Sequence, residues 1–136
     1  MSKELSGGCD CGAIHYRLKG FVRLIVNCHC NACRKRNGSA YSTYCMVAHE
    51  NFSIDRGQEY LSVYENEKSG KKHFCSKCGS PLYNFNPRFE GRFMVVYGSL
   101  AEYKDYAPSF NVFCESQLPW VENIASIKSF EKSIER

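Results

Sequence analysis

Two short stretches, Cys-Asp-Cys-Gly at residues 9–12 and Cys-Ser-Lys-Cys-Gly at residues 75–79, decide how we expect this chain to fold. In each, two cysteines stand close enough to bind one tetrahedral metal ion, around which thiolate sulfurs sit about 3.8 Å apart. Cys-x-Cys on a strand points both side chains to one face, and a glycine lets the other stretch turn beneath the metal. Economy of ligands therefore favours one closed site, made of Cys9, Cys11, Cys75 and Cys78.

A third cluster, Cys-His-Cys-Asn-Ala-Cys at residues 28–33, is left once these two pairs are combined. Its cysteines, Cys28, Cys30 and Cys33, place three ligands on one loop. Three protein ligands and one open position are the pattern of catalytic zinc. Alternatively, a fourth side chain closes this second site and makes it structural; the candidates are Cys45, Cys114 and His29.

The cysteine content supports metal binding over disulfides. Nine cysteines cannot all pair, and the first residues lack the apolar segment of a secretory signal, so we expect a cytoplasmic protein with reduced thiols. A thioredoxin-like redox pair would need a helix after Cys-x-x-Cys, which the β-rich sequence around Cys75 does not supply. We expect two Zn²⁺ per chain, with Cys45 and Cys114 as small core side chains in strand-like runs.

Charge and hydropathy narrow the classes of partner. The formal net charge of +4 falls to about +1 when seven thiolates hold two Zn²⁺. The isoelectric point of 8.6 lies below the value of about 9 that is typical of a nucleic-acid footprint. No apolar run approaches the ~18 residues that would cross a membrane. We therefore expect neither a nucleic-acid nor a membrane partner, and the sequence leaves a homo-oligomer open.

Alternating apolar and polar residues dominate the chain and predict a mainly β, antiparallel fold. Turn residues separate the predicted strands. These strands are 13–19, a run carrying Val22, Leu24 and Val26, then 41–48, 52–54, 60–64, 72–74, 82–85, 93–97 and 110–114.

Two segments have helical character instead. Residues 31–37 end at Asn-Gly and predict one or two helical turns. Apolar residues at three- to four-residue spacing predict a short amphipathic C-terminal helix at about 124–134. The length of 136 residues fits a single domain over 1–136, with a core at about 6–121.

The motifs resemble those of the glutathione-dependent formaldehyde-activating enzyme family, which also includes centromere protein V. The resemblance extends from about residue 6 to 121. Its most specific part is the Cys-His-Cys-x-x-Cys-Arg signature at 28–34. The other matching stretches are 8–14, 38–41, 74–82, 98–100 and 108–120.

This resemblance implies a β-tent of antiparallel sheets around a structural zinc. It implies that the residue 9–11 and 75–78 pairs hold that ion and that the residue 28–33 cysteines hold the second. The family's named activity joins glutathione and formaldehyde into S-(hydroxymethyl)glutathione and is classed as a carbon–sulfur lyase. Glutathione or a similar small thiol is then the expected partner.

For the chemistry, we expect a substrate thiol to reach the open position of the second zinc and to react as a thiolate. Of the three cations that follow, Arg34 is expected to face the site, and Lys35 and Arg36 to face solvent. Ser39 and Tyr41 are further candidates for substrate binding.

Two further expectations complete the sequence-based description. Trp120, the only tryptophan, is expected to anchor packing. The rival to an enzyme is a non-catalytic module with two structural zincs that binds a protein or nucleic acid. Such a module requires the second site to be closed.

Overall fold

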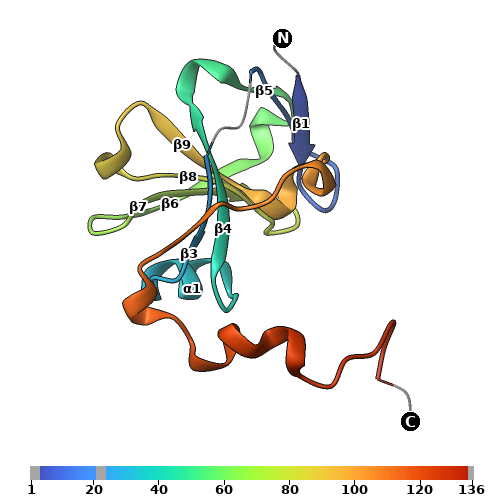
Figure 1. Cartoon of the computed structure of the whole chain (residues 1–136). Coiled ribbons are helices and arrows are strands. Elements are labelled where there is room, and N and C mark those ends of the chain that lie inside the picture. Colours follow the sequence, from blue (N-terminus) through green and yellow to red (C-terminus); the bar gives the residue numbers. More distant parts are fainter. Residues whose placement is uncertain (1–3, 21–23, 135–136) are drawn as a thin grey trace.

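Two β-sheets form most of the computed structural model, which describes residues 4–20 and 24–134 (Figure 1). The smaller sheet has the strand order β1-β2-β5, and the larger has the order β10-β3-β4-β9-β8-β7-β6. The smaller sheet contains β1 (Leu5–Gly8), β2 (His15–Leu18) and β5 (Phe52–Arg56). The larger contains β3 (Leu24–Cys28), β4 (Ser42–Ala48), β6 (Leu61–Asn66), β7 (Gly70–Cys75), β8 (Pro81–Phe85), β9 (Arg92–Val96) and β10 (Phe110–Val112). The prediction of a mainly β fold is confirmed. Val22 and the ends of the predicted 1–136 domain lie outside the described residues.

The strand pairing is antiparallel with one exception among the described strands. β10 lies parallel to β3, with Val112 opposite Cys28. Parallel neighbours require a long crossover connection, and the many residues between β3 and β10 provide one. The prediction that residues 110–114 belong to an antiparallel sheet is therefore wrong for this edge strand.

The main core joins the two sheets. Leu5, Tyr16 and Leu18 from the smaller sheet pack in one buried cluster with residues of the larger sheet, including Leu82 and the fully buried Cys45. Burying a large aliphatic side chain stabilises the fold by about 1.5–3 kcal/mol. The expected core position of Cys45 is confirmed.

The only α-helix in the described part of the chain is α1 (Asn31–Asn37), which confirms the predicted helical turns. At its N-terminus, Cys30 Sγ accepts a hydrogen bond from the Cys33 backbone N–H at 3.2 Å. Gly38 ends the helix with a left-handed backbone (φ 63°), and its N–H donates to the Arg34 carbonyl. No described helix has the length and apolar character needed to cross a membrane.

The predicted C-terminal helix at 124–134 is wrong. The chain forms 3₁₀ turns over Pro119–Ser126, with non-helical backbone at Asn123, and has no regular structure from 127 to 134. This segment runs past α1 and ends away from both sheets (Figure 1). Ile124, Ile127 and Phe130 remain 51%, 55% and 42% exposed. A short helix is stabilised mainly by packing of its apolar face, and among the described residues nothing covers that face.

Two other side chains expected in the interior are exposed. Trp120 is 47% exposed, so it does not anchor the core. Cys114 lies in an exposed 3₁₀ turn, Cys114–Ser116, which follows a left-handed residue at Phe113 (φ 56°). The backbone reversal at Phe113 ends the strand two residues earlier than predicted and turns Cys114 away from the core.

Candidate metal centres and an adjoining cavity

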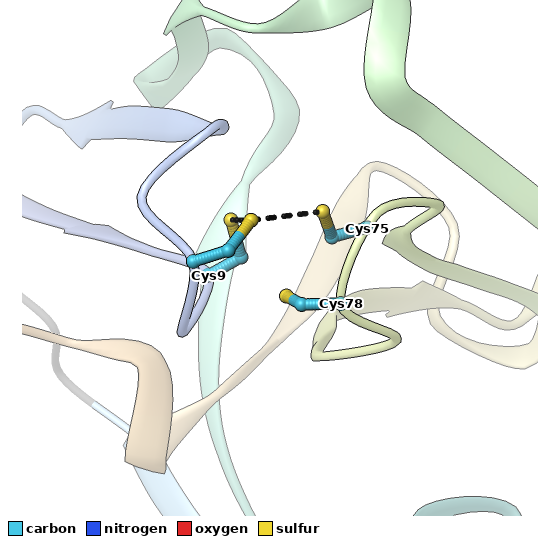
Figure 2. Close-up of side chains that lie close together, drawn as sticks. Cys9, Cys75 and Cys78 are labelled. Carbon is cyan, nitrogen blue, oxygen red and sulfur yellow. Dashed lines mark hydrogen bonds between the residues drawn. The ribbon is translucent and has the colours of Figure 1, made fainter.

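Four cysteines from two loops meet between the sheets (Figure 2). Cys9 and Cys11 lie in the loop after β1 of the smaller sheet, and Cys75 and Cys78 lie at the end of β7 of the larger sheet. Their sulfur atoms all lie within 4.8 Å of one another, with 3.6 Å between Cys9 and Cys11 and 3.8 Å between Cys11 and Cys75. We call these four residues the inter-sheet cluster, because they connect the two sheets.

Hydrogen-bond donors surround this cluster and stabilise negative charge on it. The Ser80 hydroxyl, followed by the backbone N–H groups of Cys11 and Ser80, lowers the pKa of Cys78 to about 6. Burial alone would raise the pKa of Cys9, but the Ile14 N–H, 3.2 Å from its sulfur, and neighbouring thiols keep it below 9.0. At Cys11, the Ala13 N–H favours the thiolate, but burial and the neighbouring thiols outweigh it and raise the pKa of Cys11 to about 11. The sulfurs therefore ionise as an interacting group.

The donor set of the inter-sheet cluster fits a tetrahedral thiolate-binding ion. Four sulfurs at these separations match the chemistry of Zn²⁺, whereas Ca²⁺ and Mg²⁺ take oxygen ligands. Cys75 is fully buried, so an ion here would lie at the junction of the sheets. The structure thus establishes a four-thiol cluster able to hold a metal, and the identification of that metal as zinc stays a prediction.

A second group, the loop cluster, consists of Cys28, Cys30 and Cys33. Cys28 ends β3, while Cys30 and Cys33 lie at the start of α1. Their sulfurs also lie within 4.8 Å of one another. Within residues 4–20 and 24–134, no other histidine, cysteine or acidic ligand atom belongs to this group.

None of the three candidates for closing the loop cluster is part of it. Cys45 is buried in the main core and Cys114 is exposed. His29 is buried but is held elsewhere: its Nε2 lies 3.2 Å from Asn111 Oδ1, and its ring packs 4.9 Å from that of Tyr41. The described residues therefore supply three ligands here.

A buried hydroxyl adjoins the loop cluster. The Tyr44 hydroxyl accepts hydrogen bonds from the side-chain amides of Asn37 at 2.9 Å and Asn84 at 3.1 Å. Both lone pairs are then used, and its proton is directed to another acceptor. Cys33, which packs with Tyr44 in a small buried cluster, is the neighbouring sulfur. Burial, followed by the charge of Cys33, raises the pKa of Tyr44, so this phenol stays protonated and acts as a donor.

A cavity of about 220 Å³ opens beside Cys28 and Cys30, and we call it the cysteine cavity. Most of its wall is apolar; the apolar lining residues are Val26, Ala32, Met46, Phe89, Met94, Val112 and Phe113. Two cations line it, Lys68 and Arg88, and the Arg88 guanidinium lies 5.8 Å from the centre of the Phe113 ring. A small molecule can thus approach the loop cluster through a largely apolar space.

The residues expected to bind substrate lie outside this cavity. Arg34 and Ser39 line a different, shallow depression near Trp120, and the Arg34 guanidinium bonds to Asn31 Oδ1 at 2.7 Å. Tyr41 packs on His29. Their role in substrate binding stays a prediction. The cations that line the cysteine cavity are Lys68 and Arg88, and Arg88 lies in a 3₁₀ turn, Pro87–Phe89, without a motif that would reveal it.

Arg36 is also placed differently from the expectation that it faces solvent. It is partly buried, and its guanidinium donates to the backbone carbonyl of Ser69 at 3.0 Å. This contact ties α1 to the turn between β6 and β7. Lys35 remains exposed, as predicted.

Comparison with known proteins assigns the family. Residues 4–116 match the family model described as glutathione-dependent formaldehyde-activating enzyme. A Halomonas elongata protein named "Putative glutathione-dependent formaldehyde-activating enzyme" is 33% identical over 91 residues, which are 62% of this chain and 58% of that protein. The chain thus matches little more than half of this relative's length.

A solved structure supports the fold. The crystal structure of a Rhodobacter sphaeroides protein superposes with a TM-score of 0.65 at 20% identity, over 79% of this chain and 99% of that one. Together with the family match over residues 4–116, this agrees with the signature motifs in the sequence. The chain belongs to the glutathione-dependent formaldehyde-activating enzyme family.

Proposed function

We propose that this protein is a zinc-dependent enzyme that forms and cleaves the carbon–sulfur bond between a small thiol, such as glutathione, and formaldehyde or a related aldehyde. Family membership and the name of the Halomonas relative support this activity. The observation that carries it is the loop cluster, which offers three thiol ligands beside a cavity of about 220 Å³. A reducing compartment such as the cytoplasm would keep these thiols available.

The two clusters have separate roles in this proposal. The inter-sheet cluster holds one zinc and fastens the sheets together, whereas the loop cluster holds a second zinc beside the substrate. Zinc bound at the loop cluster would supply one effect, a lowered pKa for a thiol that enters the cavity, so that the reactive thiolate is present at neutral pH.

The protein's own side chains create the setting for the reaction. Met46, Met94 and Val112 form an apolar wall that limits the access of water to the reacting sulfur. Arg88 places a positive charge at the same cavity, which favours a negatively charged sulfur or oxygen there. These residues raise the local concentration of thiolate and aldehyde in a defined orientation.

The addition of the thiol to the aldehyde is balanced in atoms and electrons without another reactant. The sulfur electron pair attacks the aldehyde carbon, a carbon–sulfur bond forms, and the carbonyl π bond becomes an electron pair on oxygen. The oxygen takes up one proton, which equals the proton that the thiol has lost. The reverse sequence releases the aldehyde and the free thiol.

Tyr44 positions the loop cluster. Its hydroxyl accepts from the amides of Asn37 and Asn84, and we infer that its proton points toward the neighbouring Cys33 sulfur. Such an outer contact fixes the orientation of a ligand and reduces its negative charge. Tyr44 is therefore a positioning residue for Cys33.

The test is the rate of exchange between formaldehyde, glutathione and their adduct, measured by NMR exchange spectroscopy with catalytic amounts of zinc-loaded protein. The wild type should accelerate exchange, Cys30→Ser should not, and the matched control Cys114→Ser should behave as wild type because Cys114 is exposed and lies outside both clusters. Wild-type protein that binds two zinc ions but leaves the exchange rate unchanged would contradict the proposal and favour a non-catalytic zinc module.

A further inference from the structure

A larger cavity lies next to the cysteine cavity. It measures about 570 Å³ and runs between α1 and the β6–β7 hairpin. Ala32 and Ser69 line both cavities, so the two spaces adjoin. Ligand sites for small molecules usually measure about 300–1,000 Å³, a range that the cysteine cavity alone does not reach. A ligand that extends beyond the reacting group therefore has room in this second space.

Local periodicity explains which side chains face this second cavity. Ala32, Lys35 and Arg36 stand three and four residues apart on α1 and so share one helical face. Across the cavity, Tyr64 is paired with Lys72 in the β6–β7 ladder, and alternate residues of a strand share a face. The opposite wall accordingly carries Tyr64, Asn66, Lys72 and Phe74.

Positive charge gathers here without a balancing acid. Lys35, Arg36 and Lys72 all line the cavity, and none of its described lining residues is an aspartate or glutamate. In the part of the chain that the structure describes, His15 and Arg17 are the only cationic residues that form ion pairs, so the cations of this cavity form none. We call this cavity the basic groove.

Two of the three cations, Arg36 and Lys72, are held close to each other by hydrogen bonds. Lys72 Nζ donates to the Arg36 carbonyl at 2.6 Å, and the Arg36 guanidinium donates to Ser69. Burial, followed by the charge of Arg36, lowers the pKa of Lys72. Like charges placed together in a partly desolvated groove raise the free energy of the empty site, and an anion relieves this cost.

We propose that the basic groove binds the anionic part of the thiol substrate, a carboxylate or phosphate group, while the thiol sulfur lies in the cysteine cavity. This inference rests on the proposed function, because it takes the loop cluster as the place of reaction. Tyr64 and Phe74 supply an aromatic wall for the uncharged segment between the sulfur and the anion. The substrates selected are thiols that carry a negative group at a distance from the sulfur.

The test measures binding of two unreactive probes to the zinc-loaded full chain by isothermal titration calorimetry. S-methylglutathione offers carboxylates, and S-methyl-4′-phosphopantetheine offers a phosphate. At least one should bind, and the tighter probe identifies the anion. Lys35→Met and Lys72→Met should each weaken that binding about tenfold, the size expected for a lost charge-assisted contact. Added salt should weaken wild-type binding as well.

Lys104→Met is the matched control, because Lys104 is exposed, lies outside both cavities and has the same charge. Lys35 makes no hydrogen bond in the described structure, so Lys35→Met should keep its circular dichroism spectrum even if Lys72→Met does not fold. The inference would be overturned if Lys35→Met and Lys72→Met both bound the probe with the same affinity as Lys104→Met. It would also be overturned if the wild type bound neither probe. Groove-dependent probe binding without accelerated formaldehyde exchange would instead contradict the proposed function alone and leave the anion site supported.

Discussion

The inter-sheet cluster and the loop cluster use the same donor atom but connect very different parts of the chain. In the former, Cys11 and Cys75 are 64 residues apart; Cys11 lies in the loop after β1 of the smaller sheet, and Cys75 ends β7 of the larger one. In the latter, Cys28 and Cys33 belong to one loop and helix start beside a cavity. An ion that joins distant segments closes a long loop of the chain, whereas an ion held by one short segment closes only a short loop. A link that closes a long loop is expected to stabilise the fold more. Position in the fold, more than ligand type, therefore separates a structural role from a chemical one.

The largest expected effect comes from breaking the inter-sheet cluster. Cys75→Ser removes a buried thiol at the junction of the sheets. Structural zinc contributes about 10–16 kcal/mol to the folding of small zinc domains. Because a typical domain is stable by only about 5–15 kcal/mol, we expect the variant to unfold or aggregate. Circular dichroism during heating measures this, with Cys114→Ser as the control. A cooperative transition at the wild-type temperature would show that the cluster does not hold the sheets together.

Breaking the loop cluster should change metal content more than fold. Cys30 is partly exposed, and Cys30→Ser leaves all four ligands of the inter-sheet cluster in place. We expect one zinc fewer per chain by native mass spectrometry, with a folded circular dichroism spectrum. If Cys30→Ser and Cys75→Ser lose structure alike, the division between the two clusters is wrong.

A milder variant tests how the loop cluster is positioned. Tyr44→Phe removes the acceptor for the Asn37 and Asn84 amides and the inferred donor toward the neighbouring Cys33 sulfur. Loss of such an outer contact typically weakens metal binding about 10- to 100-fold. Competition with a chelator measures the affinity, and the sulfur-to-cobalt absorption band of the Co²⁺-loaded protein should shift. Tyr103→Phe, at an exposed position, is the control. An unchanged band in Tyr44→Phe would place the hydroxyl proton elsewhere.

The smallest expected effect lies in the smaller sheet, away from the loop cluster. His15, followed by Arg17, holds the pKa of Asp55 below its ordinary value of 3.8. A carboxyl whose pKa is lower in the folded state stabilises the fold above the unfolded pKa, and this stability is lost as pH falls through the folded value. Asp55→Asn should therefore lower the melting temperature slightly at pH 7, and the difference from wild type should shrink below about pH 4. Glu59→Gln, which removes an exposed carboxyl, is the control. A difference that grows on acidification would contradict this sign.

Features that depend on short-range spacing could be predicted from the sequence. Within each pair or triplet, the cysteines need only a few residues to place their sulfurs together. Economy of ligands and the family resemblance then joined the two pairs, and the two predicted groups are the groups that meet in the structure. Residues 31–37 carry their own stop signal, and α1 ends there. Most strands follow the alternation that the pleated sheet requires.

Features that depend on contacts between distant residues could not be predicted from the sequence. β1 has the sequence Leu-Ser-Gly-Gly, which has weak strand propensity, yet it pairs with β2 because Gly7 lets the Tyr16 ring approach closely; a Cβ there would lie 2.4 Å from the ring. The helical spacing after residue 124 predicts a face that nothing in the described structure covers. The cysteine cavity draws its wall from several strands, so no local pattern marks Arg88.

The most direct measurement of the division between the two clusters is stepwise removal of metal by a chelator, followed together by native mass spectrometry and circular dichroism. We predict two zinc ions per chain, of which the first leaves without change in the β-sheet spectrum and the second leaves as that spectrum collapses. Release of both ions in a single step with unfolding, or a spectrum that survives the loss of both, would contradict the account.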